Sequence, residues 1–173
     1  MTSNALAASR KKALPGAVKL TGSYPLHIAL RSNGGEKVTY EVVKLLTLSA
    51  PDVLTTQDLS GAVPLSIALQ KKVGSQIIRY LVEKNKGAAG IVDQKRNYPL
   101  HFACTDVMGK KRYSLLVIRL VFEAYPDALY GKNSDGRTPM ELAKEAKSRG
   151  SPSFGLGDGV DGIVTYLQKV GRR

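Results

Sequence analysis

Hydrophobic residues in this chain recur in short segments that each contain a proline near the start. The four segments read GSYPLHIAL, GAVPLSIAL, RNYPLHFAC and GRTPMELAK, and their aligned prolines are Pro25, Pro64, Pro99 and Pro139. The prolines are spaced 39, 35 and 40 residues apart. Proline suits the first position of a helix, because its fixed φ is helical and its missing N–H would have no partner there. Each segment therefore predicts a helix that begins at its proline.

A second apolar phrase follows each proline segment. It reads VVKLL from Val42, IIRYL from Ile77, VIRLV from Val117 and IVTYL from Ile163. Apolar pairs such as Val42–Val43 and Leu45–Leu46 recur at helical spacing, which predicts a second helix with a buried stripe. Residues with capping side chains stand two or three positions ahead of the phrases, at Thr39, Ser75, Ser114 and Asp161. The sequence thus predicts four units of two helices each.

Polar segments such as TQDLSG (56–61) and KNSDGR (132–137) separate the units. They contain Asp, Asn, Ser and Gly, which are the residues of tight turns. A single two-helix unit cannot bury its apolar face alone, so we expect stability to come from the stacking of neighbouring units.

These phrases resemble the ankyrin repeat, in which a turn precedes a helix reading TPLHxAA and a second helix reads EVVKLL. EVVKLL occurs at Glu41–Leu46, PLHIA and PLHFA match the first helix, and DGRTPMELA from Asp135 to Ala143 includes the turn. The resemblance covers Gly22 to about Val170. It implies an all-α, ankyrin-like helical repeat solenoid of four helix–turn–helix units with inserted helix–helix loops. The units are predicted at about 22–57, 58–92, 93–132 and 133–170, within a repeat domain spanning 22–173.

Three of the four units depart from the ankyrin pattern just ahead of the proline. Tyr24, Val63 and Tyr98 replace the threonine that only Thr138 retains. Each lost side-chain cap is expected to cost about 1 kcal/mol unless another group replaces it. From each proline to the second phrase the chain runs 17, 13, 18 and 24 residues, so we expect insertions in the first, third and fourth units.

The chain's two histidines, His27 and His101, occupy the same place in two of the first helices. Copies two units apart in such a stack lie roughly 20 Å apart, since each unit adds about one helix diameter, whereas zinc–nitrogen bonds are about 2 Å long. A shared metal site is therefore not expected. The resemblance implies instead that each histidine hydrogen-bonds an adjoining turn. Core contacts between units are expected from Leu26, Leu65, Leu100 and Met140, and close helix contacts from Ala29, Ala68, Ala103 and Ala143.

Charge is the unusual part of the composition. The 173 residues include 26 Lys and Arg against 14 Asp and Glu, which gives a net charge of +12. Such an excess favours acidic partners, namely a nucleic acid, an anionic membrane or an acidic protein surface. Residues 1–21 contain four of the basic residues and no acid, which predicts a basic, flexible arm or an organelle import signal.

Two further features bear on location. No apolar stretch approaches the roughly 18–20 residues that a membrane span needs. The single cysteine, Cys104, cannot form an internal disulfide, which favours an intracellular setting, cytoplasmic or nuclear. Its place on a first helix predicts a packed small apolar residue.

No grouping of nucleophile, base and third partner is visible, so we expect neither an enzyme nor a cofactor. The resemblance implies a scaffold that binds an acidic protein partner through its turns and first helices. The candidate residues are Gln94, Lys95, Arg96, Asn97, Lys132, Asn133, Ser134 and Arg137 in the turns, with Gln70 and Lys71 on a first helix.

A basic edge formed by inserted loops is the alternative binding surface. Lys110, Lys111 and Arg112 stand in one such loop, followed by Tyr113. This edge suits a phosphate backbone, so the alternative function is a basic accessory subunit of a ribonucleoprotein or organellar complex. Aromatic residues that could stack on bases are scarce there, which argues against base-specific recognition.

Overall fold

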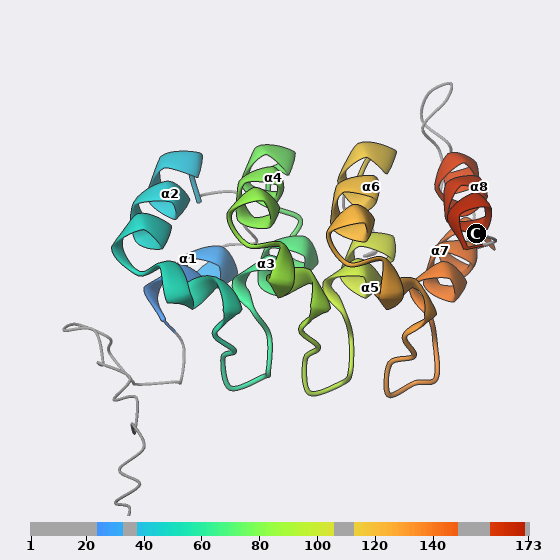
Figure 1. Ribbon diagram of the computed structural model, residues 1–173, viewed down its shortest axis with the longest axis horizontal. Coiled ribbons are helices and arrows are strands. Elements are labelled where there is room, and N and C mark those ends of the chain that lie inside the picture. The colour runs from blue at the N-terminus through green and yellow to red at the C-terminus, as the bar shows by residue number, and fades with distance from the viewer. Residues whose placement is uncertain (1–23, 33–37, 106–112, 149–159, 172–173) are drawn as a thin grey trace, which may run out of the picture.

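The computed structural model describes residues 24–32, 38–105, 113–148 and 160–171 (Figure 1). These residues form eight α-helices and three 3₁₀ helices and contain no strand, which confirms an all-α chain for this part. The α-helices are α1 (Pro25–Arg31), α2 (Tyr40–Ser49), α3 (Pro64–Gln70), α4 (Ser75–Lys84), α5 (Pro99–Cys104), α6 (Leu115–Ala124), α7 (Pro139–Ser148) and α8 (Val160–Val170). The 3₁₀ helices are η2 (Pro51–Thr55), η3 (Lys86–Gly90) and η4 (Pro126–Tyr130). The arm predicted at 1–21 lies outside the described residues.

The odd-numbered and even-numbered α-helices lie in two rows (Figure 1). Each odd-numbered helix packs against the next odd-numbered helix, each even-numbered helix against the next even-numbered helix, and the two helices of each successive pair against each other. Three loops, at 56–63, 91–98 and 131–138, project from one side of these rows (Figure 1). We call them the first, second and third turn loops. None of the described helices has the length and apolar content that crossing a bilayer requires.

Each odd-numbered helix begins at its proline, as predicted. In α1 and α5 a histidine at the third helical position accepts the backbone N–H of the residue before the proline. The backbone N–H of Tyr24 donates to His27 Nδ1 at 3.3 Å, and that of Tyr98 donates to His101 Nδ1 at 3.0 Å. This backbone N–H, which would otherwise lack a partner at the start of the helix, therefore has a histidine side chain of the same helix as its acceptor.

The other two proline-led helices differ at this position. In α7 the N–H of Thr138 donates to Glu141 Oε2 at 2.7 Å, and Thr138 Oγ1 accepts from the N–H of Glu141 at 3.3 Å, which forms a reciprocal cap. In α3 the residue two positions after the proline is Ser66, where α1 and α5 have histidine. Its buried Oγ makes no hydrogen bond within the described residues. The side-chain caps predicted to be lost at Tyr24, Val63 and Tyr98 are absent in all three helices.

Two of the four predicted caps of the even-numbered helices are correct in position. Thr39 caps α2 by accepting the N–H of Val42 at 3.4 Å, and Ser114 precedes α6 without a side-chain bond. The predictions at Ser75 and Asp161 are wrong. The helix α4 already begins at Ser75 with Gly74 as its cap, a residue that also suits this position, and α8 begins at Val160.

The core lies between the two rows and between successive helix pairs. Leu26, Leu65 and Leu100 are each at most 1% exposed, as expected, whereas Met140 is only half-buried. The alanines expected at helix contacts are buried at Ala68, Ala103 and Ala143 and half-buried at Ala29. The 3₁₀ helices were not predicted from the sequence. They add the buried residues Val53, Leu54, Ala88, Ala89, Ala128 and Leu129 to the core.

Candidate partner-binding surface

Each turn loop folds around one side-chain oxygen. In the first, Asp58 Oδ1 accepts the N–H groups of Ser60 at 2.8 Å and Ala62 at 3.1 Å. Asp93 and Asn133 do the same in the second and third loops, each accepting two backbone N–H bonds of 2.8 to 3.0 Å. These bonds close a tight turn locally, which is why Asp and Asn stand at equivalent places, six residues before the prolines.

Asp58 also ties the first turn loop to α1. Its carboxylate forms an ion pair with the guanidinium of Arg31. Although burial raises the pKa of the Asp58 carboxyl, hydrogen bonds from Ser60 and Arg31 outweigh it and hold that pKa below its usual value. The carboxylate is therefore charged at neutral pH and keeps the loop bonded to the helix.

Backbone hydrogen bonds join each turn loop to the next. The N–H of Gln94 donates to the carbonyl of Ser60 at 3.1 Å. The N–H of Ser134 donates to the carbonyl of Lys95 at 2.8 Å. Together with the local turns, these bonds hold the three loops as one continuous surface, which we call the turn row.

Several predicted site residues use their side chains within the turn row. Gln94 Nε2 donates to a backbone carbonyl of the first turn loop at 2.7 Å, and Asn133 Nδ2 donates to Asn97 Oδ1 at 3.0 Å. Arg137 forms an ion pair with Glu145 of α7 at 2.5 Å. These four predicted residues order the surface, and a partner would have to replace bonds that they already make.

The remaining turn candidates are Lys95, Arg96, Lys132 and Ser134, and all four are exposed. Lys95 and Arg96 make no ion pair with another described residue. Arg96 adopts a left-handed backbone with φ of 58°, where the first and third turn loops have Gly61 and Gly136. An arginine is held in a conformation that favours glycine.

The two candidates on a first helix are not brought together with the turn row. Gln70 is exposed and Lys71 half-buried at the end of α3. This end lies about 9 Å along the helix axis from Pro64, where the first turn loop joins α3. They flank the turn row rather than belonging to it.

Leu59, at the tip of the first turn loop, was not among the predicted site residues. It is 68% exposed. It stands five residues before its proline, the same register as Gln94 and Ser134, so aligning the turns would have identified it. The turn row therefore presents an apolar side chain in its first loop and cations in the other two.

The alternative basic edge is described only at its last residue, because Lys110, Lys111 and Arg112 lie outside the described residues. Tyr113 is 8% exposed, and its hydroxyl donates to the carbonyls of Ala68 at 3.1 Å and Val73 at 3.2 Å. Lys72 Nζ lies 4.7 Å from the centre of the Tyr113 ring. The ring is therefore part of the fold and is not available to stack on a base.

Most of the net positive charge belongs to segments outside the described residues. The segments outside the described residues are 1–23, 33–37, 106–112, 149–159 and 172–173, and they hold 11 of the 26 lysines and arginines but only three of the 14 acids. They contribute +8 of the net +12. Three of these segments, 33–37, 106–112 and 149–159, join an odd-numbered helix to the following even-numbered helix and are therefore separate in sequence from the turn loops. Together these three carry +2 of the charge.

His27 and His101 each hydrogen-bond an adjoining turn loop, as expected. His27 Nε2 lies 3.0 Å from the carbonyl oxygen of Thr56, and His101 Nε2 lies 3.1 Å from that of Arg137. Burial lowers the pKa of both imidazoles. Within the described residues, no group of three or more His, Cys, Asp and Glu is placed to hold a metal ion.

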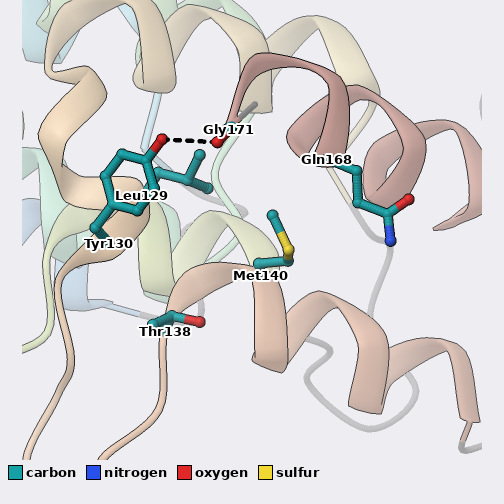
Figure 2. Close-up of a pocket in the computed structure, with 6 residues that line it drawn as sticks. All are labelled: Leu129, Tyr130, Thr138, Met140, Gln168 and Gly171. Atoms are coloured by element: carbon teal, nitrogen blue, oxygen red, sulfur yellow. Dashed lines mark hydrogen bonds between the residues drawn. The ribbon is translucent and has the colours of Figure 1, made fainter. Parts of the chain in front are cut away.

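A cavity of about 290 Å³ lies where the end of α8 approaches η4 and the start of α7 (Figure 2). The residues that line it are Leu129, Tyr130, Thr138, Met140, Gln168 and Gly171. The Tyr130 hydroxyl donates to the carbonyl of Gly171 at 3.1 Å across one side (Figure 2). None of the six carries a carboxylate, imidazole or thiol, so the cavity suits an apolar group rather than a charged one.

No known family model matches the sequence, and no curated protein matches it either.

Proposed function

We propose that this chain is an ankyrin-like repeat array that serves as a non-catalytic protein–protein interaction scaffold, and that its turn row binds an acidic partner surface. One observation carries the proposal. Three turn loops are hydrogen-bonded to one another, and they hold the side chains of Lys95, Arg96 and Lys132 exposed on the same row.

Recurrence of the same local structure supports the ankyrin-like assignment. Each of the three turn loops has an Asp or Asn oxygen that accepts two N–H groups, a left-handed residue three positions later, and a helix that begins at the proline. Two of the proline-led helices have a histidine that contacts the turn loop of the next helix pair. Both features agree with the motifs that the sequence repeats.

The chemistry of the turn row favours an acidic protein segment with an apolar residue at one end. Backbone bonds order the loops before any partner arrives, so little conformational entropy is lost on binding. Lys95, Arg96 and Lys132 would meet carboxylates, which speeds association and fixes orientation. Leu59 would meet an apolar side chain next to the first turn loop.

Charge reversal on the turn row tests the proposal. The probe is a fluorescein-labelled oligoglutamate peptide whose binding is followed by fluorescence anisotropy. We expect Lys95→Glu with Lys132→Glu to weaken binding by roughly tenfold or more, because both exposed cations become repulsive. The matched control is Arg79→Glu with Lys86→Glu, which changes the net charge equally at exposed positions on α4 and η3. Equal losses in the two variants would contradict binding at the turn row.

A second candidate function rests on the +8 carried by the segments outside the described residues. These segments, the inserted loop with Lys110, Lys111 and Arg112 among them, would contact a phosphate backbone as part of a ribonucleoprotein. A single-stranded RNA oligonucleotide is the probe. Affinity that falls steeply with salt, and that is unchanged by Lys95→Glu with Lys132→Glu, would favour this second function. A salt-insensitive complex, or none, would eliminate it.

A further inference from the structure

The first helix pair lies at one end of the two rows (Figure 1), and several of its apolar side chains are exposed. We call these side chains the exposed face. Val42 and Leu45 of α2 are 43% and 66% exposed, although Val43 between them is buried. The predicted burial of both apolar pairs is therefore wrong for Val42 and Leu45. Ile28 of α1 is 51% exposed as well. All three belong to the first helix pair, which lies at one end of the two rows (Figure 1).

The same positions are buried in the second helix pair. Val42 and Leu45 correspond in register to Ile77 and Tyr80 of α4, which are 5% and 7% exposed. The cover there is α2, the even-numbered helix of the preceding pair. Its Tyr40 ring meets the Tyr80 ring edge-on, and the hydroxyls of Thr47 and Tyr80 are hydrogen-bonded at 2.7 Å.

We propose that residues 1–23 cover this face, as the second half of an incomplete unit. The first argument is length. In each of the three complete cases, 24 residues run from the start of an even-numbered helix to the residue before the next proline, at Tyr40–Val63, Ser75–Tyr98 and Leu115–Thr138. The segment that ends at Tyr24 is long enough for the same half-unit.

The second argument is register. Leu14 stands 11 residues before Pro25, where the other turns have the buried residues Val53, Ala88 and Ala128. Gly22 stands three residues before Pro25, where Gly61, Arg96 and Gly136 have a left-handed backbone. Both positions carry the residue type that the half-unit requires. The segment differs from the three turn loops at Lys19, six residues before Pro25. The turn loops have Asp58, Asp93 and Asn133 at this position, so a turn in the segment would lack the side-chain oxygen that closes the other three.

The exposed face could be covered by residues 1–23 or by a second copy of the chain, and the covalent link of residues 1–23 to α1 favours the first. The segment joins α1 directly at Tyr24, so its local concentration at the exposed face is on the order of millimolar. A second copy, at its concentration in solution, would have to displace a segment present at this local concentration. Among the residues of α8 whose side chains the structure describes, the exposed ones are Thr165 and Lys169, so no large apolar side chain of that part of the helix matches the exposed Val42 and Leu45.

The same substitution at two places in the segment tests the proposal. In the full chain we compare Leu14→Asp with Leu20→Asp by amide hydrogen exchange. Leu20 stands five residues before Pro25, the register of the exposed Leu59, Gln94 and Ser134, and is the matched control. We expect Leu14→Asp to speed exchange in α2 by roughly tenfold or more. Leu20→Asp should leave α2 unchanged, and α6 should be unchanged in both variants, which shows that the rest of the chain stays folded.

Two results would overturn the proposal. One is equal behaviour of Leu14→Asp and Leu20→Asp in α2. The other is a dimer, detected by light scattering, that Leu45→Asp dissociates and Leu14→Asp does not, since a second copy would then cover the face. The proposal does not depend on the function of the turn row, because Leu14→Asp should leave the oligoglutamate affinity unchanged.

Discussion

The Nε2 atom of His101 lies 3.1 Å from the carbonyl oxygen of Arg137, which places the ring between α5 and the third turn loop. Its Nδ1 already accepts the N–H of Tyr98 at 3.0 Å. The ring is therefore the neutral tautomer with its hydrogen on Nε2, and it donates to the carbonyl. His27 has the matching arrangement, with Nε2 3.0 Å from the carbonyl oxygen of Thr56. Protonating either ring would place a hydrogen on Nδ1, which would then face the backbone N–H of Tyr24 or Tyr98 and could no longer accept its hydrogen bond.

We expect the protein to lose stability as the pH falls below about 6.5. Burial lowers the pKa of His27 and His101 and outweighs the backbone hydrogen bonds that raise it. The unfolded chain therefore takes up protons at a higher pH than the folded chain, so stability is full above the unfolded pKa and declines towards the folded one. Thermal unfolding followed by circular dichroism at a series of pH values measures this.

A double variant separates the histidines from other groups. In His27→Gln with His101→Gln the decline below about pH 6.5 should disappear. The lowered pKa of Asp58 acts in a different window, because stability from a carboxylate is lost only as the pH falls below about 4. A melting temperature in the unaltered chain that is constant from neutral pH to about pH 5 would contradict the assigned tautomers.

The helices could be predicted where a single residue type restricts the backbone. The four prolines identified the starts of α1, α3, α5 and α7, because proline is compatible with few other helical positions. The 3₁₀ helices were missed, since five residues are too short to show a periodic pattern. Ser75 was misplaced by one residue because Gly74 caps α4 equally well.

The turn row was predictable in its place along the chain, and less so in the contacts of its individual side chains. Exposure of Lys95 and Lys132 follows from their place in polar turns. The bond of Asn133 to Asn97 depends on the packing of two loops, which no local pattern encodes. The burial of Tyr113 likewise depends on the carbonyls of Ala68 and Val73, at least 40 residues away in sequence.

Arg96→Gly should stabilise the protein by about 1 kcal/mol. Arg96 has a φ of 58°, which is strained for a residue with a Cβ atom, and Gly61 and Gly136 stand at the equivalent places. The gain is smaller than the strain because glycine also adds entropy to the unfolded chain. Urea denaturation measures the change. A midpoint that falls in Arg96→Gly would mean that the arginine side chain makes a stabilising contact.

Gly61→Ala should destabilise the protein more than Gly136→Ala. Both glycines have a positive φ, of 73° and 75°, so each substitution introduces backbone strain of about 1–2 kcal/mol. A Cβ atom at Gly136 would meet nothing within 4 Å, whereas one at Gly61 would lie 2.8 Å from the backbone nitrogen of Gln94. Gly61→Ala therefore also disturbs the hydrogen bond between Gln94 and Ser60, which joins the first two turn loops. Equal urea midpoints for the two variants would contradict a joined turn row.

Cys104 should react with a thiol reagent only after the protein unfolds. The side chain is buried, and burial raises the pKa of its thiol to about 12, so the reactive thiolate is scarce near neutral pH. We expect labelling by iodoacetamide to be slow in native buffer and complete in urea, as measured by mass spectrometry. Labelling of the native protein as fast as that of a free cysteine would place the thiol outside the core.

Ser66→Ala and Thr47→Val remove one buried hydroxyl each and should change stability in opposite directions. Ser66 is 1% exposed and its Oγ has no hydrogen bond within the described residues, so replacing it by alanine should stabilise the protein by about 1 kcal/mol. Thr47 is hydrogen-bonded to the hydroxyl of Tyr80, which is 7% exposed. Thr47→Val leaves that hydroxyl unpaired and should cost about 1–3 kcal/mol. Urea denaturation of both variants decides the matter. A loss of stability in Ser66→Ala would show that this hydroxyl has a partner, and the start of α3 would then be capped after all.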